Sequence, residues 1–273
     1  MLPFWVSIAV LSLAQGGLVL LPAARPFPVL DRLRNRWWAV IPAASVGGVV
    51  AGVSATGDAA TALTYLALGG VPVLAGVALG RAGRGGRPAV ALAVVPVFAV
   101  AWATRTSLAG HTAALLLTAL SCVTLAALLA AVAPARWLKV GIVAMAIVDA
   151  VLVAADLLQA PNQVLNAAAP GAGLPQLQSV VFGSAQMGYG DLFIATALGA
   201  LLAADRSTQR RAAVLTAGFA LAFDALFLVA PELPATVPIA VALVVLELRA
   251  RRRAAAPDAV SRRPAVAGVL EAP

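Results

Sequence analysis

Long stretches without arginine or lysine are the feature that most constrains how this chain can fold. Hydrophobic residues fill 62% of its 273 positions and charged residues 11%, against roughly 45–50% and about 25% in soluble domains. A helix needs about 20 apolar residues to cross a bilayer. We therefore predict an all-α polytopic membrane protein with nine transmembrane helices, at about 3–21, 38–56, 60–80, 88–104, 112–133, 137–158, 179–203, 212–230 and 233–248.

The basic residues indicate how these helices are oriented. Eighteen of the 19 arginines and lysines follow helices one, three, five, seven and nine, and only Arg105 falls on the opposite side. Because basic loops stay in the cytoplasm, the N-terminus is predicted outside and the C-terminus in the cytoplasm. The net charge of +8 is therefore a topology signal. It is not gathered on the single basic face that a nucleic-acid partner requires.

The division of the chain is predicted to be simple. We expect a single transmembrane domain, residues 1–249, and a basic, disordered cytoplasmic tail, residues 250–273. Residues 159–178 are uncharged and contain several prolines and glycines, which predicts an outer loop. The only histidine, His111, is assigned to another outer loop, and the only cysteine, Cys122, to the buried interior. The expected location is a prokaryotic cytoplasmic membrane.

Four aspartates lie inside the predicted helices: Asp149, Asp156, Asp191 and Asp224. A carboxylate in the bilayer centre costs at least about 2.5–3.5 kcal/mol, so each one needs a partner, a water-filled cavity or a function. Asp149 and Asp191 lie ~18 Å from the cytoplasmic ends of two consecutive antiparallel helices, where they can face each other. Asp224 reaches a similar depth beside two phenylalanines, which favours helix packing, and Asp156 is expected further out in a polar cleft. For any single aspartate, a hydrogen bond that fastens two helices is an alternative.

Small residues surround Asp191 in the sequence. Ser184, Gly188, Asp191 and Ala195 would share one face of a helix, and Gly188 and Gly190 remove side-chain bulk beside the carboxylate. Two carboxyl groups held close together cannot readily both ionise. Such a pair can activate water with its charged member and polarise a carbonyl with its protonated member, and this chemistry needs no metal or cofactor.

The sequence Gly188-Tyr189-Gly190-Asp191 is a GxGD motif, accompanied by Asp149 and by Pro234-Ala235 at the start of the ninth helix. This combination resembles the presenilin and signal peptide peptidase family of intramembrane aspartyl proteases. The resemblance implies that Asp149 and Asp191 form a catalytic dyad. It also makes helices six to nine (137–248) the catalytic part and helices one to five (3–133) a scaffold. The residues implied to support the active site or the substrate are Gly188, Tyr189, Gly190, Pro234, Ala235 and Thr236.

Prolines mark the start of the ninth helix. Pro234 lies ~22 Å from the predicted cytoplasmic end, close to the depth of the aspartates. Pro231, Pro234 and Pro238 withhold backbone donors, and the backbone around them is a place where an unwound substrate segment can pair as an added strand. A proline-rich turn that caps the helix explains the same residues.

The predicted orientation is that of signal peptide peptidases, which implies substrates with a cytoplasmic N-terminus, such as signal-peptide remnants or type II membrane segments. The expected partners are these substrates and the lipid bilayer. Two other interpretations stay open. One is a prepilin-peptidase-like GxGD protease, although Leu192, Phe193 and Ile194 stand where such enzymes commonly carry a lysine. The other is a proton-coupled transporter that uses the intramembrane aspartates as a relay.

Overall fold

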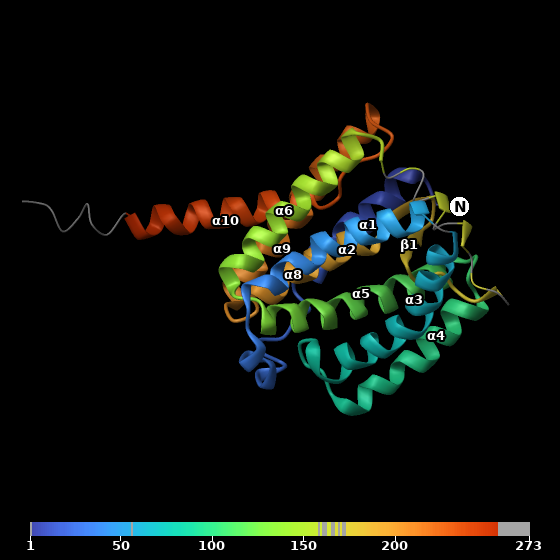
Figure 1. Cartoon of the computed structure of the whole chain (residues 1–273), viewed down its shortest axis with the longest axis horizontal. Helices are drawn as coiled ribbons and strands as arrows, with labels where there is room; N and C mark the ends of the chain where they lie inside the picture. Colours follow the sequence, from blue (N-terminus) through green and yellow to red (C-terminus); the bar gives the residue numbers. More distant parts are fainter. Residues whose placement is uncertain are drawn as a thin grey trace, which may run out of the picture.

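The computed structural model describes residues 2–55, 57–157 and 173–255, together with positions 159, 163, 164, 167, 168 and 170. Parts of the predicted outer loop 159–178 and the end of the predicted tail, 256–273, lie outside the described residues. The described chain is mostly helical, as predicted. Within it, nine α-helices follow one another in the order of the nine predicted windows (Figure 1).

The helices differ widely in length, and most begin or end within a few residues of the predicted limits. Some are extended by a short 3-10 helix, for example Pro88–Ala93 before α4 and Ala225–Leu228 after α9. The described α-helices are α1 (Phe4–Leu18), α2 (Ile41–Ala55), α3 (Gly57–Val77), α4 (Val94–Ala103), α5 (Leu108–Val132), α6 (Ala135–Ala154), α8 (Tyr189–Leu202), α9 (Arg206–Asp224) and α10 (Val237–Ala255).

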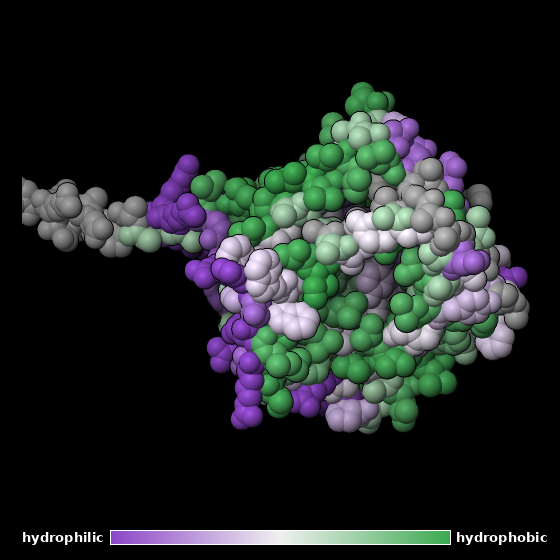
Figure 2. All heavy atoms as spheres, viewed as in Figure 1, coloured by the Kyte–Doolittle hydropathy of each residue, from purple (hydrophilic) through white to green (hydrophobic). Residues whose placement is uncertain are grey.

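Four helical stretches are long and apolar enough to cross a membrane: Asp58–Ala82, Leu108–Val132, Ala135–Ala154 and Arg206–Leu228. Three apolar helical stretches, Phe4–Leu18, Pro88–Ala103 and Tyr189–Leu202, are shorter, and at 1.5 Å per residue they do not reach across a hydrocarbon core of about 30 Å. Figure 2 shows apolar side chains over much of the visible flank, with hydrophilic ones gathered near the far end of α10. The four longer helices suggest a membrane protein, whereas nine crossings and their orientation remain predictions.

The prediction of a seventh helix over residues 179–203 is wrong for the first half of that range. Residues Ser179–Phe182 and Ala185–Gly188 form an antiparallel hairpin, β1 and β2, and α8 begins only at Tyr189. The valines and phenylalanine of β1 favour a strand, and Gly183 takes a positive φ of 60° in the two-residue turn. Ser184 and Gly188 therefore lie in the hairpin and do not share a helix face with Asp191.

Four smaller predictions also need correction. The helix α6 ends at Ala154 and not at 158, since the chain enters the left-handed region at Asp156 (φ 54°), which aspartate tolerates. Asp156 is exposed and does not extend the face that carries Asp149. His111 lies inside α5, whose start is capped by the Ser107 side chain. The helix α10 continues to Ala255, into the predicted disordered tail.

The main core lies where α1 packs against α8, α9 and the hairpin. Leu11 of α1, Ile142 of α6 and Leu192 and Leu198 of α8 are among its fully buried side chains. A second core joins α3 and α4 to α5. Cys122 of α5 is completely buried, as predicted. The central position of α1 places its few polar residues inside the protein.

A close approach of backbones fixes the contact between α8 and the chain that follows α1. A methyl group on Gly199 would collide with the backbone of Val19, whereas one on Gly218 of α9 would meet no atom within 4 Å. We expect Gly199→Ala to lower the free energy of unfolding by about 1–3 kcal/mol, because overpacking forces the backbone to move. Gly218→Ala should leave stability unchanged or raise it by up to about 1 kcal/mol, since alanine favours helix.

Both variants can be compared by reversible denaturation in mixed micelles. Equal stability of the two variants would contradict the close packing of α8 against residue 19.

Candidate active site

One large cavity, of about 1120 Å³, lies between α1, α6, α8 and the segment that precedes α10, and it extends to α2 and α3. Seven of the predicted site residues line it, and Pro234 does not. The cavity is therefore not confined to the predicted catalytic part, residues 137–248, because α1 supplies part of its wall. The seven residues are Asp149, Gly188, Tyr189, Gly190, Asp191, Ala235 and Thr236.

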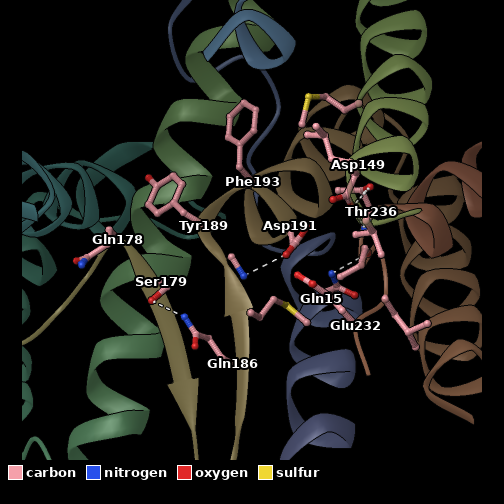
Figure 3. Close-up of a pocket in the computed structure, with 18 of the residues that line it drawn as sticks. Gln15, Asp149, Gln178, Ser179, Gln186, Tyr189, Asp191, Phe193, Glu232 and Thr236 are labelled. Carbon is pink, nitrogen blue, oxygen red and sulfur yellow. Dashed lines mark hydrogen bonds between the residues drawn. The ribbon is translucent and has the colours of Figure 1, made fainter. Parts of the chain in front are cut away.

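The two aspartates implied as a dyad reach this cavity from different helices. Asp149 comes from the C-terminal half of α6, and Asp191 from the first turn of α8. Figure 3 shows their side chains on neighbouring walls of the cavity. Their carboxyl groups are close enough for electrostatic interaction. The structure thus brings together two acids that lie 42 positions apart in the chain.

Asp149 is held by Thr236, the last residue of the Pro-Ala-Thr sequence. The Thr236 hydroxyl donates to Oδ2 of Asp149 at 2.7 Å, and the Thr236 backbone N–H donates to the same oxygen at 3.3 Å. Thr236 is only 1% exposed. Because α10 begins at Val237, this backbone N–H precedes the helix and is free to bond a side chain. The oxygen Oδ1 of Asp149 makes no hydrogen bond within the described chain and is left for the cavity.

Asp191 is held by the start of its own helix. The backbone N–H of Gly188, the residue before α8, donates to Oδ2 of Asp191 at 3.1 Å. This is the backward bond by which an acid in the first turn satisfies a helix N-terminus. A methyl group on Gly188 would sit 3.2 Å from that oxygen, so glycine leaves the room for this contact. Gly190, by contrast, faces open space.

Tyr189 fastens the GxGD motif to α5. Its hydroxyl lies 2.8 Å from the hydroxyl of Ser121, and its backbone carbonyl accepts a long contact of 3.8 Å from the Cys122 thiol. About two helical turns further along α8, the Thr196 hydroxyl donates to the backbone carbonyl of Cys122. The contacts of Tyr189 therefore set the position of the motif beside the cavity.

Polar residues of α1 complete the site, and the sequence reasoning missed them. Gln15 is 1% exposed and donates through Nε2 to the backbone carbonyl of Ala235 at 3.1 Å. The Ser12 hydroxyl donates to Oδ2 of Asp224 at 2.8 Å, which ties α1 to α9. The sequence did carry a signal for these residues, because Ser12 and Gln15 are polar side chains three residues apart in a strongly apolar stretch. Asp224 makes the bond between helices that its sequence context favours.

Glu232 is a third acid beside the dyad that sequence reasoning overlooked. It lies on the non-helical segment between α9 and α10, lines the cavity and is within electrostatic range of both Asp149 and Asp191. No arginine, lysine or histidine is among the described residues that line the cavity. In the described part of the chain, no group of three or more histidine, cysteine, aspartate or glutamate residues is placed to hold a metal ion.

Comparison of the chain with protein-family models, with curated proteins and with solved structures found no match. The inference of function therefore depends on the site geometry and on the residues of its motifs.

The bond between Thr236 and Asp149 can be tested without an activity assay. Thr236→Val keeps the shape of the side chain but removes the shorter of the two hydrogen bonds to Oδ2 of Asp149, so the free energy of unfolding should fall by about 1–3 kcal/mol. Thr236→Ser should retain most of the stability because it keeps the hydroxyl. Denaturant titration in mixed micelles measures the difference.

Thr112→Val is the matched control. The Thr112 hydroxyl is exposed and bonds only to Leu108 of its own helix, so its loss should change stability by less than about 0.5 kcal/mol. If Thr236→Val is as harmless as this control, Thr236 does not hold Asp149.

Proposed function

We propose that this protein is an intramembrane aspartyl protease of the presenilin and signal peptide peptidase type, with Asp149 and Asp191 as its catalytic dyad. The observation that carries the proposal is one cavity that is lined by both aspartates and by Ala235 and Thr236 of the Pro-Ala-Thr segment, from three separate parts of the chain. Each aspartate has one oxygen fixed by a protein donor. The other oxygen of each is available for water or for a peptide carbonyl.

The chemistry follows from two neighbouring carboxyl groups that share one proton. The ionised carboxylate takes a proton from water as the water oxygen bonds to the scissile carbonyl carbon, and the protonated carboxyl gives its proton to the carbonyl oxygen. When the resulting diol collapses, the C–N bond breaks and the amine nitrogen takes the proton held by the first carboxyl. The second carboxyl recovers a proton from the diol, which restores the starting state.

A helical substrate must unwind before this reaction, because its peptide groups are paired within the helix. The cavity offers non-helical backbone on two sides of the aspartates. The strand β2 contributes Gln186, Met187 and Gly188 to the lining, and residues 233–236 precede α10. An unwound segment laid against either backbone gains main-chain hydrogen bonds as an added strand.

We further propose nine crossings of a prokaryotic cytoplasmic membrane, with the N-terminus outside and the C-terminus inside. The order of the described helices and the eighteen-to-one division of basic residues support this topology. It favours substrates with a cytoplasmic N-terminus, namely signal-peptide remnants or type II membrane segments. A prepilin-peptidase-like enzyme would use the same dyad on a leader at the cytoplasmic face.

The dyad can be tested with purified protein and a helical membrane peptide in bicelles. Asp149→Asn and Asp191→Asn should each lower the cleavage rate at least about 100-fold, since general acid–base catalysis contributes about 10²–10⁴-fold. Asp224→Asn is the matched control within the same cavity and should retain measurable activity. Full activity in either dyad variant would refute the assignment. Complete loss of cleavage in Asp224→Asn would instead assign the catalytic role to Asp224 of α9.

A proton-coupled transporter is the second candidate, because Asp224 and Glu232 join the dyad in lining the cavity. Four acids in one cavity suit a proton relay as well as hydrolysis. Proteoliposomes separate the two functions. Proton-driven uptake without peptide cleavage would favour the transporter, whereas cleavage without uptake would favour the protease.

A further inference from the structure

Three arginines gather at the end of the protein where α1 and α8 finish and α9 begins. Arg84 donates to Oε1 of Gln209 at 2.8 Å, and Arg206 donates to the same oxygen at 3.0 Å. Two nitrogens that share one acceptor in this way lie no more than about 6 Å apart. Arg210 lies four residues after Arg206 on the same face of α9, close enough for electrostatic repulsion between them. We call these three residues the arginine cluster.

Buried Gln209 and backbone carbonyls hold the cluster in place. Gln209 is fully buried, and its Nε2 donates to the carbonyls of Pro22 and Gly199. Arg84 also donates to the carbonyl of Ala203, and Arg206 to that of Leu20. These acceptors orient the guanidinium groups but carry no net charge. The fold thus holds like charges close to one another where the chain connects one helix to the next.

No carboxylate neutralises the cluster within the described residues. The two ion pairs found there join Arg34 to Asp31 and Lys139 to Glu247. Asp205 is adjacent in sequence, but its carboxylate accepts hydrogen bonds from the backbone and hydroxyl groups of Ser207 and Thr208. Those bonds, led by the Thr208 hydroxyl, lower the pKa of Asp205 to about 2. Asp205 therefore stays ionised and caps α9, but it forms no ion pair with the three arginines in the described part of the chain.

We propose that the arginine cluster binds the phosphate group of an anionic phospholipid in the cytoplasmic leaflet. Arg84 uses only Nη2 and Arg206 only Nη1 for the bonds described, so each guanidinium keeps further donors. Arg210 makes no hydrogen bond within the described chain and is exposed. The bonded nitrogens of the two guanidiniums lie within about 6 Å of each other, so their further donors can reach one phosphate and donate to it at about 2.8 Å. Basic pockets between helix ends on this side of a membrane are a known site for such headgroups.

The position of the cluster explains what a bound lipid does. It joins the connection after α1, the connection before α4 and the start of α9, which are all predicted cytoplasmic. A phosphate held there removes the repulsion among the three guanidiniums and tightens the contact between α1, α8 and α9. This proposal does not depend on the protease assignment, because it concerns stability and lipid binding.

The experiment follows the thermal midpoint of the full-length protein in mixed micelles as phosphatidylglycerol or phosphatidylcholine is added. A ligand that binds only the folded state raises the midpoint with concentration. We expect phosphatidylglycerol to raise it and phosphatidylcholine to leave it unchanged. Sodium phosphate at the same concentration separates a lipid site from a free-phosphate site. An equal rise with sodium phosphate would overturn the lipid assignment.

Arg210→Gln is the main variant, because removing the Arg210 guanidinium group breaks none of the hydrogen bonds that hold the cluster in place. Arg211→Gln is the matched control on the same helix with the same change in charge. Arg210→Gln should weaken phosphatidylglycerol binding about five- to tenfold, and Arg211→Gln should not. Arg84→Gln should weaken it at least as much, provided that the variant folds. Equal responses of Arg210→Gln and Arg211→Gln, or no response of the wild-type protein, would overturn the proposal.

Discussion

A carboxyl group inside an apolar protein must find hydrogen-bond donors, and this requirement accounts for much of the fold around the cavity. Asp149 of α6 takes its donors from Thr236, so the chain before α10 cannot continue as a helix. Asp191 takes its donor from the N–H of Gly188, so α8 starts inside the protein at a strand end. Two of the non-helical stretches therefore lie where these partly buried acids find their donors.

The first helix makes this arrangement possible. Its polar residues reach three separate parts of the site: Ser7 contacts the hairpin turn, Ser12 bonds Asp224, and Gln15 bonds the carbonyl of Ala235. The hairpin turn is also held from α5, where Nδ1 of His111 accepts the Gly183 N–H. A helix that is otherwise apolar can thus hold three neighbouring parts of the chain through three polar side chains. The predicted scaffold helices take a direct part in shaping the cavity.

Much of the helix order could be predicted because apolar length and charge placement are local properties of the sequence. The pairing of Asp149 with Asp191 was suggested by equal depth in two antiparallel helices, and the structure places both in one cavity. The hairpin was missed because its residues are as apolar as those of a helix, and composition alone does not distinguish the two. Gln15 and Glu232 were missed because their partners lie more than 40 positions away in the chain and no local pattern reveals such contacts.

The claim that Asp149 and Asp191 act together is tested most directly by a transition-state analogue. A transmembrane peptide with a hydroxyethylene group in place of one peptide bond puts a hydroxyl between the two carboxyl groups. An aspartyl protease should bind it at least about 100-fold more tightly than the same peptide with an ordinary amide. Titration calorimetry of the two peptides in bicelles measures this ratio. Equal affinity for both peptides would contradict a working dyad in this cavity.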